Sequence, residues 1–338
     1  MLSQDPSYRA PLSVVVPVFN EREVLPELSR RIHAVASRLG TPHELILVDD
    51  GSSDGSWEEI LALTFTDRRI KALRLSRNFG HQIAITAGLH AATGDAVVVM
   101  DADLQDPPEV IAALYERFRD GFDVVFAQRR AREGETLWKR STAKMFYRLM
   151  RQMTSLDIPV DTGDFRLMSR RVVNDLCRLQ ENSPFIRGLV TWVGYNQTAV
   201  PYERGRRYGG HTKFSTAKMM TFALDGITSF SSRPLRLASH AGVFLAAASL
   251  VLMLGLAIYK LSGGTAVIRG WTSLIAAILF LGGLNLIAIG LLGEYVGRIH
   301  DQVKGRPLYL VQDRVNLLQS SGAPLEYDAR AGHGVVPR

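Results

Sequence analysis

The chain has 338 residues and a formal net charge of +7, from 40 lysines and arginines against 33 aspartates and glutamates. This length accommodates one large α/β domain and a further element. The single cysteine, Cys177, excludes an internal disulfide and is typical of a reducing compartment. The positive charge suits an anionic membrane surface or phosphorylated substrates. Because no nucleic-acid-binding motif is recognisable, we expect no nucleic acid partner.

Strands and helices are predicted to alternate through the first part of the chain. Apolar, β-branched runs predict buried strands at residues 12–18, 44–48, 70–75, 96–100 and 123–127. Helices are expected at residues 21–39, 56–64, 81–92 and 109–119. This order predicts an α/β fold, with a mostly parallel sheet covered by helices on both faces. In such sheets, ligands bind at the carboxyl ends of the strands.

The second part of the chain is predicted to meet a membrane. Residues 137–153 and 213–230 mix basic and large apolar side chains, which is typical of interfacial amphipathic helices, although packing within the protein explains them nearly as well. Residues 241–259 and 270–293 contain no charged side chain over 19 and 24 residues. As helices they would measure about 29 and 36 Å, enough to cross a hydrocarbon core of about 30 Å. We expect a two-helix transmembrane hairpin; the alternative is a pair of helices buried in a soluble protein.

Basic residues flank this predicted hairpin unevenly. Five lie outside the spans and two lie in their connecting loop: Arg233, Arg236, Arg298, Lys304 and Arg306 against Lys260 and Arg269. Positive residues favour the cytoplasmic side, so we expect both termini in the cytoplasm and a multi-pass protein of the plasma (inner) membrane. The expected organisation is an α/β domain with interfacial helices at 1–232, the spans within 233–298 and a tail at 299–338. A lone hairpin has little to pack against, which favours a homo-oligomer, for instance a tetramer.

Acidic residues directly follow the fourth predicted strand. Asp101 and Asp103 are separated by one residue, and Gln105 follows two residues later. If the chain bends there, these oxygens converge, and such hard ligands suit Mg²⁺ or Mn²⁺ bound to a diphosphate. A divalent cation would stabilise the charge of a departing nucleoside diphosphate. The alternative is an ordinary acidic cap or turn at the end of a strand.

A second acidic pair, Asp49 and Asp50, follows the second predicted strand. These carboxylates are suited to accept hydrogen bonds from a base or from ribose hydroxyls, and Gly51 permits a tight turn beside the ligand. Pro17 and Glu21, which leave the neighbouring first strand, are expected to wall the same nucleoside pocket. The alternative is an Asx-turn followed by a helix cap at Ser53 or Asp54.

Further candidates lie beyond the predicted sheet. The polar stretch 161–166 is expected to form a turn in which Asp164 orients or deprotonates an acceptor and Arg166 pairs with a phosphate. A turn carboxylate paired with a neighbouring arginine is the competing interpretation. Arg129 ends the fifth strand, and residues 204–213 form a glycine-containing basic segment suited to close over phosphates. A solvated basic loop is the alternative for that segment.

Together these segments resemble a known family. The stretches VVVPVFNE, VDDGSSDGS, LSRNFGH, DADLQDPPE and TGDFRLM are similar to those of family 2 glycosyltransferases, which have the Rossmann-like GT-A fold. More narrowly, the chain resembles the polyprenyl-phosphate glycosyltransferases, with the bactoprenol glucosyltransferases nearest and the dolichol-phosphate mannose synthases close. The resemblance covers residues 12–310, including LLGEYVGRIHDQVKGRPLYL near the C-terminus.

The resemblance implies inverting transfer of a sugar from a nucleotide donor to a polyprenyl phosphate. It favours UDP-glucose as donor and undecaprenyl phosphate as acceptor, with UDP-aminoarabinose, a UDP-N-acetylhexosamine or GDP-mannose left open. By position, it assigns the metal to Asp101, Asp103 and Gln105 and the nucleotide-sugar to Pro17, Glu21, Asp49, Asp50, Asp101 and Arg129. It assigns catalysis to Asp164 and the phosphates to Arg129, Arg207 and Lys213.

Two other functions remain to be weighed. A processive polysaccharide synthase of the same broad fold usually carries more spans and a Gln-x-x-Arg-Trp pattern, and residues 187–192 lack that spacing. A non-catalytic membrane component that binds nucleotide sugars or lipids would not need the complete series of aspartates. Metal-dependent release of UDP on addition of a lipid phosphate separates an enzyme from such a binding module.

Overall fold

The structure, a computed structural model, describes residues 11–130, 162–179, 181, 185–205 and 271–317, with short scattered runs between 235 and 262. The chain divides into two compact units. One comprises Met1–Tyr147, Leu156–Ser215 and Arg306–Arg338, and the other Arg148–Ser155 and Thr216–Gly305. The predicted amphipathic helices at 137–153 and 213–230 and the predicted phosphate ligands Arg207 and Lys213 lie outside the described residues.

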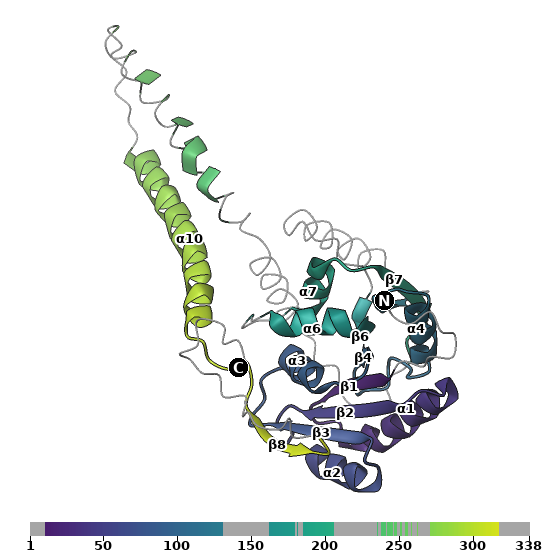
Figure 1. The fold of residues 1–338 in the computed structure, drawn as a ribbon. Helices are drawn as coiled ribbons and strands as arrows, with labels where there is room; N and C mark the ends of the chain where they lie inside the picture. The colour runs from purple at the N-terminus through teal and green to yellow at the C-terminus, as the bar shows by residue number, and fades with distance from the viewer. Residues whose placement is uncertain are drawn as a thin grey trace, which may run out of the picture. The chain divides into compact units, whose positions relative to one another are not determined.

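Among the described residues, the first unit is built on one eight-stranded sheet (Figure 1). The strand order is β7-β5-β6-β4-β1-β2-β3-β8. The strands are β1 Leu12–Val18, β2 His43–Asp49, β3 Ile70–Leu75, β4 Ala96–Val99, β5 Val124–Arg129, β6 Thr162–Ser169, β7 Gln197–Tyr202 and β8 Val311–Val315. All five predicted strands are therefore present, within a few residues of their expected ends.

The sheet is mixed: six strands run in one direction, as expected of a mostly parallel sheet, and β6 and β8 run against them. The pairs β1–β2, β1–β4, β2–β3 and β5–β7 are parallel, whereas β6 runs antiparallel to β4 and β5, and β8 runs antiparallel to β3. The segment predicted to be a polar turn is the wholly buried strand β6. The prediction of a turn was wrong because it assumed that the charged side chains face water. They instead form ion pairs and hydrogen bonds inside the domain.

Helices pack on both faces of the sheet because side chains alternate along each strand. Val14 and Val16 of β1 share a core with α1 (Leu25–Leu39), α2 (Ser56–Thr66) and α4 (Val110–Arg119). The opposite face of β1 carries α3 (His81–Ala91), whose Gly88 lies so close that an added Cβ would be 2.2 Å from Val15 Cγ1. Two further helices, α6 (Arg170–Arg178) and α7 (Ile186–Val193), pack against each other, and α6 also contacts α3 (Figure 1).

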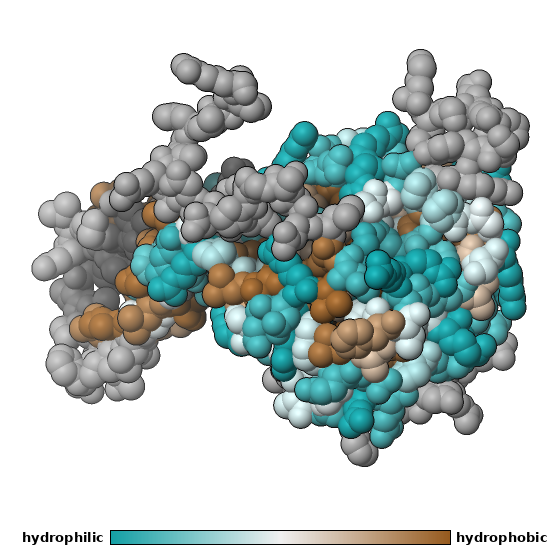
Figure 2. All heavy atoms as spheres, turned by 60° about the horizontal axis from the view of Figure 1, so that its bottom comes forward, coloured by the Kyte–Doolittle hydropathy of each residue, from teal (hydrophilic) through white to brown (hydrophobic). Residues whose placement is uncertain are grey.

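The second unit contains the helix α10, Trp271–Val303. Within it, Phe280–Val303 is long and apolar enough to cross a membrane. Many large hydrophobic side chains of this helix are exposed, for example Leu286 at 71 % and Ile287 at 70 %. Much of the visible surface of the sheet-containing unit is hydrophilic (Figure 2). The second predicted span is thus a helix that continues ten residues past Gly293, while most of the predicted span at 241–259 lies outside the described residues.

Candidate functional site

The site lies at one edge of the sheet, where β4 ends and β6 begins. Because β6 is antiparallel to β4, with Val99 opposite Arg166, the start of β6 lies at the carboxyl end of β4. Asp164, near the start of β6, therefore comes close to Asp101, which follows β4. The sequence places these carboxylates 63 positions apart, and the antiparallel pairing brings them together.

His81 bridges the two carboxylates. Its Nε2 lies 3.3 Å from Asp101 Oδ1 and 3.2 Å from Asp164 Oδ2, and ligand atoms of the three residues all lie within 4.8 Å of one another. Burial raises the pKa of Asp101 to about 6, opposed by His81 and reinforced by Asp164. Asp101 Oδ1 is buried. It lies close enough to His81 for an ion pair, but the geometry is not that of a hydrogen bond. Within the described residues, this oxygen therefore has no hydrogen-bond partner.

A cation fits this arrangement. A buried carboxylate oxygen without a hydrogen bond is costly unless a positive charge lies beside it. Asp101 is one of the three predicted metal ligands, and it alone belongs to the cluster with His81 and Asp164. The other two predicted ligands lie in the following turn, where Asp103 Oδ1 accepts a hydrogen bond of 3.0 Å from the Gln105 N–H.

The turn after β4 is held in a strained conformation. Leu104 adopts a φ of 54°, in the left-handed region that a bulky residue rarely occupies, and its side chain is buried. Such strain costs on the order of 1–3 kcal/mol and persists where surrounding contacts impose it. The Gly205 N–H donates to the Gln105 carbonyl at 2.8 Å, which fixes the turn from outside. The strained turn therefore lowers the stability of the fold while it fixes the orientation of the residues around Asp103.

Asp106, which sequence reasoning overlooked, ties this turn to the far strands. It is 1 % exposed and accepts hydrogen bonds from the Tyr202 hydroxyl and from Arg204 Nε, the latter at 3.1 Å. Arg129, a predicted nucleotide-sugar ligand, donates from Nε to the Tyr202 hydroxyl at 3.3 Å and places Nη2 3.8 Å from Asp106. A Cβ on Gly163 would be 2.8 Å from the Arg129 Nη2, so only glycine leaves this arginine its present position.

The predicted nucleoside ligands Asp49 and Asp50 are buried at the end of β2, at 0 % and 3 % exposure. Asp50 accepts hydrogen bonds of 2.7 and 2.9 Å from the N–H groups of Phe79 and Gly80. Burial raises the pKa of Asp50, and these bonds only partly offset it. The carboxylate thus clamps the loop that leads into His81, the first residue of α3.

The neighbouring turn matches the Asx-turn of the alternative interpretation, but the residue that caps α2 is Gly55 and not Ser53 or Asp54. The Ser52 N–H donates to Asp49 Oδ1 at 3.1 Å, and the Ser56 N–H donates to Asp54 Oδ1 at 2.9 Å. Asp49 Oδ2 is buried without a hydrogen-bond partner in the described part of the chain, although Arg74 Nε lies 3.5 Å away. Of the two expected pocket walls, Pro17 is buried within β1, whereas Glu21 is partly exposed.

Asp164 is surrounded by hydrogen-bond donors. Arg187 of α7 donates from Nε to Oδ1 at 2.8 Å and from Nη2 to Oδ2 at 3.1 Å, and Gln82 Nε2 donates to Oδ2 at 3.1 Å. Despite its burial, the Arg187 charge and the bonds from His81 and Arg187 hold the pKa of Asp164 well below its ordinary value. The paired arginine that the sequence suggested is therefore Arg187, 23 residues away, and not its neighbour Arg166.

Arg166 itself points into the domain. Its side chain is 4 % exposed, Nη2 donates to the Gly163 carbonyl at 2.9 Å, and burial lowers its pKa to about 10. Nothing in the local sequence distinguishes Arg166 from Arg187 as the partner of Asp164, since both are single arginines among apolar residues.

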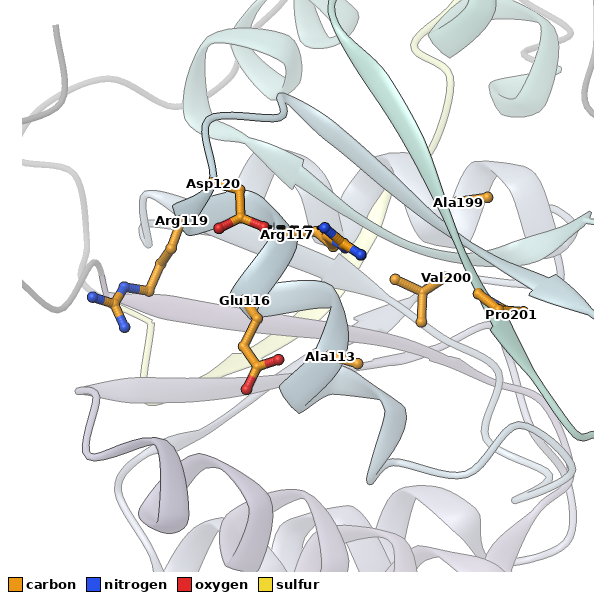
Figure 3. Close-up of a pocket in the computed structure, with 8 residues that line it drawn as sticks. All are labelled: Ala113, Glu116, Arg117, Arg119, Asp120, Ala199, Val200 and Pro201. Atoms are coloured by element: carbon orange, nitrogen blue, oxygen red, sulfur yellow. Dashed lines mark hydrogen bonds and ion pairs between the residues drawn. The ribbon is translucent and has the colours of Figure 1, made fainter.

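A separate hollow of about 640 Å³ lies between α4 and β7 (Figure 3). Its lining includes the ion pair between Arg117 of α4 and Asp120, the residue after that helix, and the side chains of Val200 and Pro201 on β7. None of the predicted site residues in the described part of the chain lines it. This hollow therefore contains none of the described residues that were predicted to carry the chemistry.

Comparison with known proteins gives the chain its relatives. Residues 13–177 match the model of the family described as "Glycosyl transferase family 2". The uncharacterized glycosyltransferase YkcC of Bacillus subtilis is 49 % identical over 300 residues, covering 89 % of this chain and 93 % of that protein. The SfII prophage-derived bactoprenol glucosyl transferase of Shigella flexneri is 42 % identical over 301 residues, covering 89 % and 97 %. Glucosyl-3-phosphoglycerate synthase of Mycobacterium tuberculosis, solved with Mn²⁺ and UDP, is 18 % identical with a TM-score of 0.47, covering 65 % and 78 %.

Proposed function

The chain belongs to glycosyl transferase family 2, and we propose that it transfers a sugar from a nucleotide donor to bactoprenol phosphate, a polyprenyl phosphate, at a membrane. Similarity to bactoprenol glucosyl transferases over most of both chains supports this reaction. The observation that carries it is the buried Asp101 oxygen, which accepts no hydrogen bond within the described residues and lies beside His81 and Asp164 at the strand ends. That arrangement suits a reaction in which anionic phosphate groups and a cation meet.

The proposed donor site uses the residues after β4. Asp101, with Asp103 and Gln105, would hold Mg²⁺ or Mn²⁺, which would stabilise the charge on the departing nucleoside diphosphate. Arg129, held by Asp106 and Tyr202, would pair with the donor's phosphates. The base and ribose would lie along the ends of β1 and β2, with Glu21 the accessible member of that set and Asp49 and Asp50 shaping the turn behind it.

The proposed acceptor chemistry needs little base catalysis. A phosphate monoester with a second pKa near 6 is already an anionic nucleophile at neutral pH. Its oxygen would attack the anomeric carbon from the face opposite the leaving nucleotide, with inversion. Positioning and charge stabilisation would then supply most of the rate. Arg166, Arg207 and Lys213 remain proposed phosphate contacts, although the burial of Arg166 makes it the least accessible of those that the structure describes.

The proposed membrane arrangement follows from the acceptor. A polyprenyl tail leaves a bilayer at a cost of about 0.8 kcal/mol per CH₂, so the enzyme must work at the surface. We place α10 across the bilayer as one of two spans, with both termini and the sheet domain on the cytoplasmic side. Homo-oligomerisation, for instance as a tetramer, would give such a hairpin neighbours to pack against.

The test uses the purified full chain with Mn²⁺, undecaprenyl phosphate and a panel of UDP-sugars and GDP-mannose. We expect lipid-linked sugar with UDP-glucose as the preferred donor. Asp103→Asn should lower turnover by about 100-fold or more, because a metal contributes several kcal/mol of charge stabilisation. Asp120→Asn is the matched control, since this exposed carboxylate lies outside the proposed site and pairs with Arg117. Near-normal turnover of Asp103→Asn in excess metal would refute the metal assignment, and absence of transfer to any polyprenyl phosphate would refute the proposed function.

A further inference from the structure

The chain returns to the sheet unit after α10. The other unit ends at Gly305, and the sheet unit takes up the chain again at Arg306. The strand β8 then pairs antiparallel with β3 at the edge of the sheet (Figure 1). We call residues 308–316 the C-terminal strap. Part of the sheet unit is therefore built from chain that follows the helix long and apolar enough to cross a membrane.

Side-chain contacts hold the C-terminal strap at both of its ends. Near its start, the Tyr309 hydroxyl and His90 Nδ1 are hydrogen-bonded at 3.2 Å, which joins the strap to the last turn of α3. At its end, Asn316 Nδ2 donates to the carbonyls of Thr64 and Ile70 at 3.0 and 2.9 Å. Together with the pairing of β8 and β3, these bonds give the strap a fixed place on the domain.

Leu308, the first residue of the strap, reaches three helices. It lines a hollow of about 20 Å³ together with side chains of α3, α6 and α7. The lining includes Thr86 and Leu89 of α3, Leu176 of α6, and Ile186 and Leu189 of α7. A hollow of this size has room for about one water molecule, so these side chains pack with little free space. Truncating Leu308 would therefore leave a cavity where the three helices meet.

Two residues that line this hollow also hold Gln82. The Thr86 hydroxyl donates to the Gln82 carbonyl at 2.9 Å, and the Ile186 N–H donates to Gln82 Oε1 at 3.1 Å. Gln82 in turn donates from Nε2 to Asp164 Oδ2 at 3.1 Å. One end of the Gln82 amide is thus bound to α7, and the other end is bound to the buried carboxylate of the site.

This arrangement makes the contact with Asp164 sensitive to the spacing of α3 and α7. The donor and the acceptor of an amide belong to one rigid planar group, so Gln82 cannot move toward one partner without leaving the other. Both of its side-chain bonds measure 3.1 Å, and a shift of about 0.4 Å would take either of them to the limit of a hydrogen bond. The packing that surrounds Leu308 fixes this spacing.

We infer that Leu308 is a positioning residue for the transfer reaction and that it acts through Gln82 on Asp164. It fixes the spacing of α3 and α7, and Gln82 then holds the Asp164 carboxylate beside His81. This inference rests on the proposed function, in which the residues around Asp101 and Asp164 act on the substrates. The site is therefore complete only when the chain that follows α10 has docked on the sheet unit.

The experiment measures transfer by the full chain with Mn²⁺, UDP-glucose and undecaprenyl phosphate, at a temperature well below unfolding. Leu308→Ala should lower kcat about 10-fold, because a misplacement on the order of 1 Å can cost about 100-fold, and the donor KM should stay within about twofold. Leu308→Met keeps the volume and should retain most of kcat. Leu310→Ala is the matched control, since that side chain is 55 % exposed and the substitution leaves its carbonyl bonded to the Ser76 N–H.

A double-variant cycle tests whether Leu308 acts through Gln82. Gln82→Met removes the amide and keeps a side chain of similar length. Leu308→Ala should lower kcat about 10-fold when Gln82 is present and less than about twofold in the Gln82→Met background, because both changes disrupt the same support of Asp164. Hydrogen exchange supplies a measurement that needs no substrate. The Ile186 N–H, which is bonded to Gln82, should exchange faster in Leu308→Ala than in the wild type.

The outcomes that contradict the inference are distinct from failure of the proposed function. A normal kcat in Leu308→Ala would overturn it, even if the melting temperature falls, because Leu308 would then support only the fold. Equal losses of kcat in both Gln82 backgrounds, or an equal loss in Leu310→Ala, would overturn it as well. If the wild type transfers no sugar to undecaprenyl phosphate, the proposed function fails. Unchanged exchange of the Ile186 N–H in Leu308→Ala would then refute the positioning of α3 and α7 separately.

Discussion

Replacing Gly51 by alanine tests how the turn after β2 supports the site. Gly51 has a φ of 72°, and a Cβ added there would lie 2.7 Å from both Arg77 C and Asn78 N. Both contacts are with backbone, so a side-chain rotation cannot relieve them. The loop that would have to move is clamped by Asp50 at Phe79 and Gly80.

The expected loss of stability has two parts. A left-handed conformation costs a non-glycine residue about 1–2 kcal/mol, and overpacking a fixed backbone costs about 1–3 kcal/mol more. Gly40 separates these terms, because its φ is 63° and an added Cβ meets nothing within 4 Å. Gly40→Ala should therefore cost only the conformational part. At roughly 2–4 °C per kcal/mol for a domain of this size, Gly51→Ala should melt about 2–12 °C below Gly40→Ala.

Thermal unfolding of the purified full chain, followed by tryptophan fluorescence, measures this difference. Transfer assays on the same samples should show Gly40→Ala close to wild type. Gly51→Ala should show a reduced kcat, because the displaced loop leads directly into His81, which contacts Asp101 and Asp164. Equal melting temperatures for the two variants would refute the close packing of the β2 turn on the loop before α3.

Three further predictions follow from other contacts. Tyr202→Phe removes the hydroxyl that lies between Asp106 and Arg129. The KM for the sugar nucleotide should therefore rise about fivefold, because one hydrogen bond contributes about 1 kcal/mol. Steady-state kinetics measure this change, with Tyr195→Phe as the control, and an unchanged donor KM would contradict the prediction. Burial alone would raise the pKa of Glu44, but bonds from Lys71, Ser13 and the Thr93 N–H leave that pKa below its ordinary value of 4.5. Glu44 therefore contributes its full stabilisation above about pH 4.5, and this contribution is lost as the pH falls through the lower pKa of the folded state. Melting temperatures measured at pH 3–7 should fall less steeply on acidification in Glu44→Gln than in the wild type. Identical profiles would argue against this prediction. Chelation of divalent metal should abolish transfer, and Mn²⁺ or Mg²⁺ should restore it; a rate that is indifferent to both treatments would exclude a metal at Asp101.

Local sequence determined much of the fold of this protein. Continuous apolar runs predicted five strands, and all five are present. They could be predicted because a strand that is buried on both faces of a sheet has a continuous run of hydrophobic residues. The same reasoning placed Asp49 and Asp101 after strand ends, since the end of an apolar run is visible in the sequence. The sequence motifs around these residues were sufficient to predict membership of the family 2 glycosyltransferases, and the comparisons confirm it.

A buried strand that contains charged residues could not be predicted in this way. The segment at Thr162–Ser169 contains Gly163, Asp164 and Arg166 and so was predicted to be a turn, yet every residue of it is buried. Its charges are tolerated because their partners come from other elements of the fold. The sequence shows the charges, and only the packed domain supplies the partners that make their burial possible.

The arrangement of the site was decided by tertiary structure. Asp164 meets His81 and Arg187 across 83 and 23 positions of the chain, and it meets them only because β6 runs antiparallel into the sheet beside β4 while α3 and α7 are linked by Gln82. Spacing along a chain determines neighbours within one helix or strand. Which arginine neutralises a buried aspartate depends on the order and direction of strands, and these are set by the packing of the whole domain.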